Sequence, residues 1–112
     1  MQETYIEQIL NELTLEEKIG MIHGAGLFRT EGVERLSIPP LYMSDGPMGV
    51  RAEFADNEWR NVGTTEDYVT YLPCNSAIAS TWNRALAKKA GEVLGEEARG
   101  RGKDVILAPG IN

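Results

Sequence analysis

The sequence predicts an α/β fold in which two parallel strands are joined by a long loop and a helix. Residues 41–44 and 104–108 are short apolar runs, and each ends at a turn that contains proline and glycine. Such runs are typical of buried strands in a parallel sheet. Between them, residues 84–99 place apolar side chains at helical spacing. A strand, a crossover and a second strand in this order favour a parallel sheet.

Two short helices are expected before the first strand. The first covers residues 3–13, and its apolar stripe consists of Ile6, Ile9, Leu10 and Leu13. Thr14 and Glu17 have the spacing of a capping box, which predicts the start of a second helix. The apolar face of that helix consists of Leu15, Ile19 and Ile22. Residues 24–40 are expected to form a loop, and a strand is expected only after Pro40.

Residues 46–71 are expected to form a long functional loop. Glycine, asparagine, acidic residues and threonine dominate it, and loops beyond about 15 residues are uncommon unless they serve a site or are disordered. Four aromatic residues within it indicate that it packs on another part of the protein: Phe54, Trp59, Tyr68 and Tyr71. The alternative is a flexible insertion.

The C-terminal part is expected to hold two further helices and the second strand. Residues 73–82 have a helical pattern, and Asn83 is a suitable N-cap for the helix over 84–99. Gly100 and Gly102 end that helix. Its apolar stripe consists of Leu86, Ala90, Val93 and Leu94.

Length and composition exclude several classes of protein. The 112 residues are too few for a complete (β/α)8 barrel, which needs about 200. With 11 basic and 17 acidic residues and a net charge of −6, the chain lacks the excess of basic residues that is typical of nucleic-acid-binding surfaces. No apolar run approaches the roughly 20 residues of a membrane span, so no membrane partner is expected. The acidic N-terminus does not resemble a signal peptide, so we expect a cytoplasmic protein.

The single cysteine and the single histidine argue against a disulfide framework, a metal site and a Cys–His catalytic pair. We therefore expect neither a metal nor a cofactor. Cys74 is interpreted as a small buried apolar residue, and His23 as a capping or packing residue.

Asp45 and Arg51 are the candidate ligand-binding residues. Two glycines and a proline fix the backbone between them. An ionised aspartate can accept hydrogen bonds from two adjacent hydroxyls, and an arginine presents several donors in a rigid fork. The pair would suit a polyol such as a sugar ring, or it would form an ion pair that only fixes the loop. In parallel sheets ligands bind at the carboxyl ends of strands, where we expect Asp45, Pro109, Gly110 and Asn112.

Other candidates are weaker. Trp59 would either stack on a sugar face or pack within the protein, whereas Trp82 lies on a helical pattern and is expected in the core. Glu96 and Glu97 are adjacent on a helix and point in different directions, so they are interpreted as a solvated face and not as a catalytic pair.

Several short segments are informative as an ordered set. They are Leu13–Lys18, Ile38–Pro39, Ser44–Arg51, Leu72–Pro73, Ala79–Trp82, Gly95–Arg99 and Leu107–Asn112. Together they resemble the N-terminal part of family 3 glycoside hydrolases, the β-glucosidase-like enzymes. The pattern Asp-Gly-Pro-x-Gly-x-Arg is the most specific of them, and residues 52–70 are the least diagnostic. Leu72 and Asn83 stand where the family often has phenylalanine and aspartate.

The resemblance implies that residues 1–112 are the opening portion of a (β/α)8 TIM-like barrel, incomplete in this chain. It implies that the parent protein is a retaining exo-β-glycosidase in which Asp45 and Arg51 line sugar subsite −1. The nucleophilic aspartate, the acid/base glutamate and a sugar-binding lysine–histidine pair would lie beyond residue 112. The expected partners are a glycoside or oligosaccharide substrate and the remainder of the parent chain.

Retaining hydrolysis needs two carboxyl groups about 5 Å apart, so we expect the isolated chain to be inactive, with no catalytic residue of its own. The main alternative is a non-catalytic carbohydrate-binding or assembly module of complete length. A phosphate-binding module is disfavoured because the turn after Asp45 lacks the Lys-Ser/Thr of a P-loop and the aspartate would repel phosphate.

Overall fold

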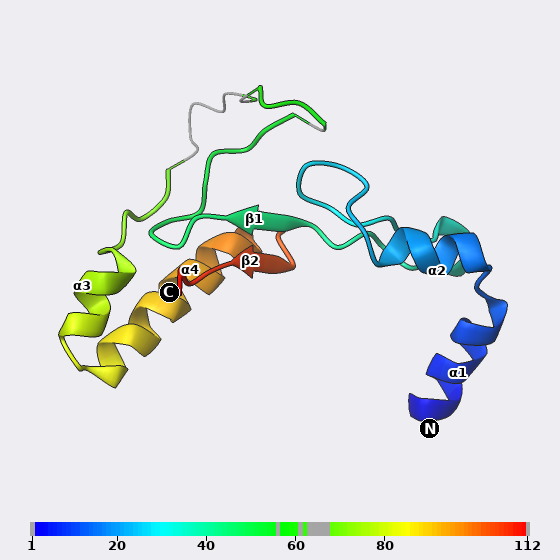
Figure 1. Ribbon diagram of the computed structural model, residues 1–112, viewed down its shortest axis with the longest axis horizontal. Helices are drawn as coiled ribbons and strands as arrows, with labels where there is room; N and C mark the ends of the chain where they lie inside the picture. The colour runs from blue at the N-terminus through cyan, green and yellow to red at the C-terminus, as the bar shows by residue number, and fades with distance from the viewer. Residues whose placement is uncertain (1, 56, 61, 63–67, 112) are drawn as a thin grey trace. The chain divides into compact units, whose positions relative to one another are not determined.

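The computed structural model describes residues 2–55, 57–60, 62 and 68–111. The chain divides into two compact units, residues 1–41 and 42–112. The first holds helices α1 (Gln2–Glu12) and α2 (Leu15–Met21) and the short 3₁₀ helix η1 (Glu34–Leu36). The second holds β1 (Met43–Asp45), α3 (Asn75–Ser80), α4 (Arg84–Gly100) and β2 (Val105–Leu107) (Figure 1). Within the described residues, no helix has the length and apolar character that crossing a membrane requires.

The capping box predicted at the start of α2 is confirmed. The backbone N of Glu17 donates to Thr14 Oγ1 at 3.2 Å, and the backbone N of Thr14 donates to Glu17 Oε2 at 2.8 Å. Arg35 in η1 adds to this motif, because its Nε donates to Glu17 Oε1 and its terminal nitrogen donates to the carbonyl oxygen of Glu12, each at 2.7 Å. One guanidinium therefore joins the end of α1, the start of α2 and η1.

The loop expected over residues 24–40 contains more regular structure than the sequence indicates. Besides η1, two isolated antiparallel bridges join Gly24 to Thr30 and Val33 to Ile38. The second bridge is closed by two backbone hydrogen bonds of 2.8 and 3.1 Å, and Val33 is buried. These are single residue pairs, so they leave no alternating pattern that a sequence would reveal.

The two strands pair in parallel, as predicted, with Met43 opposite Val105, Ser44 opposite Ile106 and Asp45 opposite Leu107. Asp45 is therefore the last residue of β1, whereas the sequence placed it just after the strand. The predicted strand therefore ends one residue too early, because pairing with Leu107 extends the ladder to Asp45.

The predicted long helix is also confirmed as α4, and it ends at Gly100. Its predicted N-cap is Asn83, whose Oδ1 accepts the backbone N–H of Leu86 at 3.1 Å. The preceding helix is shorter than its pattern. Trp82 follows α3 in a left-handed conformation, with φ of 53°.

A small apolar core fixes the second unit. Val50, Leu94 and Ala98 are buried together, and the partly buried residues Leu72, Ile106 and Ala108 pack against them. Val50 and Leu72 come from the two ends of the long loop, whereas the other four come from α4 and the β2 segment. The loop is thus anchored at both ends by apolar contacts with α4 and β2.

The interior of the loop forms a short hairpin. The backbone N of Val62 donates to Glu53 O at 3.0 Å, and that of Ala55 donates to Arg60 O at 2.9 Å. Phe54 and Trp59 meet edge to face across it, with ring centroids 5.4 Å apart. Tyr68 and Tyr71 are exposed, so only part of the predicted aromatic packing is present. Residues 56, 61 and 63–67 lie outside the described residues.

Two predictions of burial are wrong for this structure. Trp82 is 93% exposed, because it lies in the turn between α3 and α4 and does not share the inner face of either helix. Cys74 is exposed as well, because it occupies the N-cap position before α3.

Replacing Val50 by alanine should destabilise the fold by about 1 to 3 kcal/mol, since it removes two methyl groups from a side chain that is 1% exposed. Urea unfolding followed by circular dichroism measures the loss. Val62→Ala removes the same atoms from an exposed position of the same loop and should cost far less. Equal losses for the two variants would contradict this description of the core.

The contact between Glu17 and Arg35 predicts a pH dependence of the first unit. Hydrogen bonding to Arg35 is the largest cause that lowers the pKa of Glu17 from 4.5 to about 2. Because the folded pKa is depressed, the stabilisation is fully present above pH 4.5 and is lost as the pH falls towards 2. In acid titrations followed by circular dichroism, Glu17→Gln should be less stable than wild type at pH 6 and equally stable near pH 2. Glu16→Gln, on the same turn, should keep the wild-type profile between these values.

Candidate functional site

A tight turn after β1 brings Asp45 and Arg51 together. Gly49 donates its backbone N–H to Gly46 O at 3.2 Å, and Arg51 donates to Asp45 O at 3.3 Å. Gly46 has a φ of 118°, and a Cβ at this position would overlap the carbonyl oxygen of Gly49. Glycine is therefore required at this position, and the closed turn returns the chain to the end of the strand.

The two predicted site residues form a direct ion pair. Arg51 Nε lies 2.8 Å from Asp45 Oδ1. The guanidinium also donates to Ala52 O at 2.8 Å, and its central carbon lies 4.7 Å from the centroid of the Phe54 ring, within the range of a cation–π contact. Arg51 is thus held by the turn and by the hairpin.

The pair is asymmetric in exposure. The side chain of Arg51 is 15% exposed, whereas that of Asp45 is 47% exposed. An arginine that is covered and engaged in this way fixes the orientation of the carboxylate. Asp45 Oδ1 is buried against Arg51, so Oδ2 is the oxygen of the pair that is open to hydroxyl donors from a ligand.

The return segment of the loop supports the turn from the other side. Leu72 donates its backbone N–H to Met48 O at 2.7 Å, and a Cβ at Gly49 would lie 2.8 Å from Thr70 O. Thr70 in turn donates its backbone N–H to Glu97 at 3.0 Å and its hydroxyl to the same carboxylate. Glu97, interpreted from the sequence as part of a solvated face, is instead a contact between α4 and the loop.

Two more side chains near the end of α4 contact the loop. Lys103 Nζ lies 2.7 Å from Glu53 Oε2 in a largely buried ion pair, and Arg101 donates to Tyr68 O at 3.0 Å. From the sequence alone, the basic residues 99–103 are interpreted as a solvated helix face, and the structure corrects this for Arg101 and Lys103. Their partners lie 50 and 33 residues away, so no local pattern reveals the contacts.

The remaining candidates fall in different places. Trp59 is 69% exposed and contacts Phe54, which in turn lies against Arg51. His23, in the first unit, contacts Gly24 O through Nδ1 at 2.8 Å. Asn112 lies outside the described residues. In the part of the chain that the structure describes, no three His, Cys, Asp or Glu side chains are grouped to hold a metal ion.

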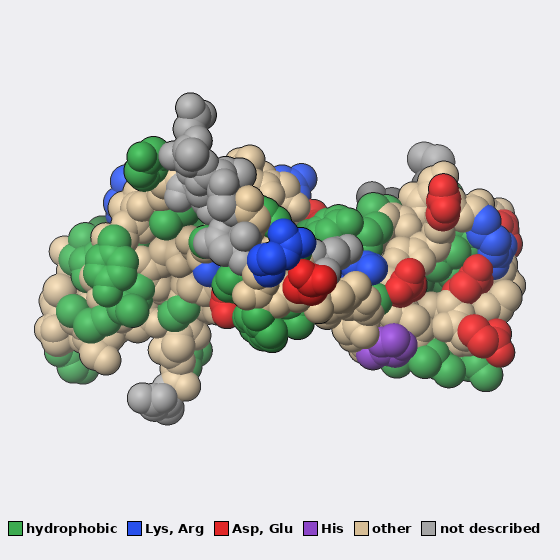
Figure 2. Space-filling view, turned by 90° about the horizontal axis from the view of Figure 1, so that it is seen from above, with side chains coloured by type: hydrophobic (Ala, Val, Ile, Leu, Met, Phe, Trp, Pro, Cys, Tyr) green, Lys and Arg blue, Asp and Glu red, His purple; other side chains and the backbone are tan. Residues whose placement is uncertain are grey.

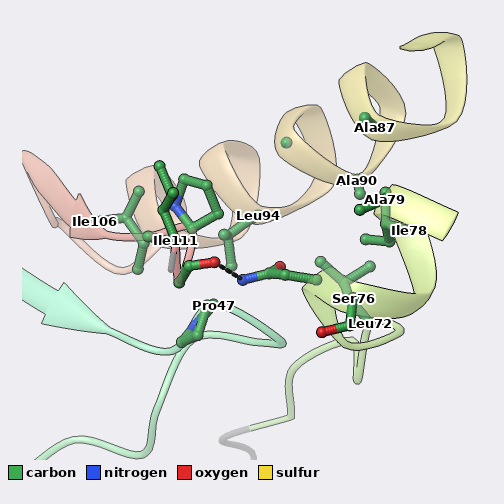
Figure 3. A pocket seen from close by; sticks show the side chains of 15 residues that line it. Pro47, Leu72, Ser76, Ile78, Ala79, Ala87, Ala90, Leu94, Ile106 and Ile111 are labelled. Atoms are coloured by element: carbon green, nitrogen blue, oxygen red, sulfur yellow. Dashed lines mark hydrogen bonds between the residues drawn. The ribbon is translucent and has the colours of Figure 1, made fainter. Parts of the chain in front are cut away.

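An apolar groove of about 660 Å³ lies beside the site, between α3, α4 and the segment after β2 (Figure 3). Ile78, Leu94, Ile106 and Ile111 line it, together with Pro109, Gly110 and Pro47. Pro109 and Gly110, expected at the same sheet edge as Asp45, thus face the groove along with Pro47 of the turn. Hydrophobic side chains also gather over the α3 and α4 end of the surface in Figure 2. A groove with this lining favours contact with another apolar surface over binding of a sugar.

Comparison with protein-family models finds no match, whereas comparison with curated sequences finds clear relatives. The chain is 47% identical over 110 residues to β-glucosidase BoGH3A of Bacteroides ovatus, which covers 98% of this chain and 15% of the relative. It is 36% identical over 107 residues to thermostable β-glucosidase B of Acetivibrio thermocellus, covering 96% of this chain and 14% of that protein. The chain therefore spans about one-seventh of the length of these relatives.

Solved structures agree with the sequence relatives. The chain superimposes on β-glucosidase 3B of Thermotoga neapolitana in complex with glucose with a TM-score of 0.79 and 35% identity, covering 96% of this chain and 16% of that one. The β-glucosidase of Kluyveromyces marxianus in complex with glucose gives a TM-score of 0.76 and 33% identity, covering 93% and 12%. Over nearly its whole length the chain is similar to a segment of these β-glucosidases, which confirms the resemblance seen in its ordered motifs.

Proposed function

We propose that the protein carrying this chain is a retaining exo-β-glycosidase of the β-glucosidase type, and that residues 1–112 form the opening portion of its (β/α)8 barrel. The observation that carries the proposal is the Asp45–Arg51 ion pair at the carboxyl end of β1, with the carboxylate half exposed. In barrels of this kind, substrates bind at the carboxyl ends of the strands. Relatives named β-glucosidase, and a neighbour solved with glucose, support this choice.

In this proposal Asp45 binds the terminal sugar at subsite −1. Its carboxylate accepts hydrogen bonds from two adjacent hydroxyls, and such charge-assisted bonds are stronger than neutral ones. Arg51 lines the same subsite and fixes the rotamer of the carboxylate through its Nε. These groups hold the sugar in place but cleave no bond.

The hydrolytic carboxyl groups are proposed to lie elsewhere in the protein. Glu97 is engaged by Thr70, and Glu96 is exposed on the neighbouring position of α4. Retaining hydrolysis requires two carboxyl groups that face each other about 5 Å apart. Adjacent side chains on a helix do not face each other, so Glu96 and Glu97 do not suit this reaction. The 112-residue chain alone is therefore proposed to be inactive.

The apolar groove is proposed to be the surface on which the rest of the barrel packs. Its lining of aliphatic side chains between α3, α4 and β2 is typical of the contact between successive strand–helix units. A complete carbohydrate-binding module would need a closed core instead. The exposure of Leu107 and Ile111 beside the groove favours the larger enzyme.

Asp45→Asn in the full-length protein should lower kcat/KM for an aryl β-glucoside roughly 100-fold. The substitution weakens two charge-assisted hydrogen bonds, each worth about 1.5 to 3 kcal/mol, and about 1.4 kcal/mol corresponds to a factor of ten. Arg51→Lys, which keeps the charge but loses the fork, should give a smaller loss. The isolated 112-residue chain should give no turnover. If that chain hydrolyses the substrate and Asp45→Ala abolishes the activity, the proposal is overturned.

Gly46→Ala should raise KM in the same assay, because the new Cβ would displace the carbonyl oxygen of Gly49 and with it the turn that presents Asp45. Gly95→Ala is the matched control, since a Cβ there meets open space on α4 and helix propensity favours alanine. A KM that is unchanged in both variants would show that the turn does not set the position of the carboxylate.

A further inference from the structure

We infer that Glu97 is a positioning residue, which holds residues 70–72 at the end of the long loop against α4 and thereby sets the geometry of the Asp45–Arg51 pair. The inference rests on the proposed function for its effect on substrate binding. Its structural part, that Glu97 orders the loop, stands on the contacts alone. The motif Gly95–Arg99 contains this glutamate, and the proposed chemistry gives it no role.

The first step is the contact between Glu97 and Thr70. The backbone N–H of Thr70 faces both carboxylate oxygens, at 3.2 Å and 3.0 Å, and the hydroxyl of Thr70 donates to Oε1 at 2.5 Å. Hydrogen bonds to an ionised acceptor are short and strong. Glu97 precedes Ala98, which is buried in the core, so the helix that carries this carboxylate is itself fixed by packing.

The second step leads from Thr70 to the turn. The carbonyl oxygen of Thr70 lies against Gly49, where a Cβ would come within 2.8 Å of it. Two residues later, Leu72 donates its backbone N–H to Met48 O at 2.7 Å. The segment 70–72 therefore lies along the turn that connects Asp45 to Arg51, and a shift of Thr70 removes the support of that turn.

The third step is that neighbouring side chains act on the loop in the same way. Arg101 donates to the carbonyl oxygen of Tyr68, and Lys103 forms an ion pair with Glu53. These contacts reach the loop on both sides of the hairpin. The described part of the loop contains no helix or strand, so these contacts with α4 and the residues that follow it add to the order that its own turn and hairpin provide.

Glu96 provides a matched control for Glu97. It is the same residue type at the adjacent position of the same helix, and it is exposed. Substitution at either position changes the net charge and helix propensity equally. A difference between the two variants therefore reports the contact with Thr70.

The test compares Glu97→Ala, Glu97→Gln and Glu96→Ala in the full-length protein, using hydrogen–deuterium exchange and steady-state kinetics with an aryl β-glucoside. In Glu97→Ala we expect faster exchange over residues 46–55 and 68–72 and a KM raised about tenfold. Glu97→Gln keeps an acceptor for Thr70 and should recover part of both effects. Glu96→Ala should match the wild type in both.

The two measurements separate the possible failures. Equal exchange over these segments in Glu97→Ala and Glu96→Ala would overturn the inference, and so would faster exchange in Glu97→Ala with an unchanged KM. If the wild-type protein hydrolyses no β-glycoside, the proposed function fails, whereas the exchange data still decide whether Glu97 orders the loop.

Discussion

The burial of Val50 is the interaction on which the rest of the second unit depends. This side chain enters the core between Leu94 and Ala98 of α4, and its neighbours in the chain are Gly49 of the turn and Arg51 of the ion pair. Fixing one residue at this point fixes the position of both. Burial of Val50 stabilises the fold because apolar area is removed from water, and this effect has no preferred direction. It therefore fixes the position of the backbone but not the orientation of the polar groups.

That orientation comes from the polar contacts around the anchor. Arg51 and Lys103 form ion pairs with Asp45 and Glu53, and Glu97 accepts hydrogen bonds from Thr70. These contacts have a preferred direction, and each joins an atom of the loop to an atom of β1, of α4 or of the segment that follows α4. Apolar burial sets where the chain lies, and the polar contacts set which way Asp45 faces.

The sequence predicts those parts of the fold that depend on local signals. The capping box at Thr14, the N-cap at Asn83 and the parallel pairing of the two strands are all confirmed. The spacing of Asp45 and Arg51 correctly places them next to each other, because Gly46 and Gly49 adopt the positive φ angles that this tight turn requires. Their role in sugar binding stays a prediction.

The sequence fails where contacts join distant residues or where the backbone takes an unusual conformation. Glu97 and Thr70 are 27 residues apart, and nothing near either residue indicates the other. Trp82 shares the helical spacing of its neighbours, but its left-handed backbone turns it out of that pattern. A periodic pattern shows on which face of a helix a side chain would lie if the helix continued. It does not show where the helix ends.

The pairing of β1 with β2 has a consequence for the order of folding. The backbone N–H of Tyr42 donates to Asp104, 62 residues later in the chain, so the sheet forms only after α4 and the start of β2 have been made. Closing so long a stretch of chain costs entropy before any contact repays it. As the protein emerges from the ribosome, the contacts of Arg35 with Glu17 and Glu12 join residues only 18 and 23 positions apart, whereas β1 must wait for β2. A mutation that slows the folding of α4 would therefore delay the pairing of the two strands.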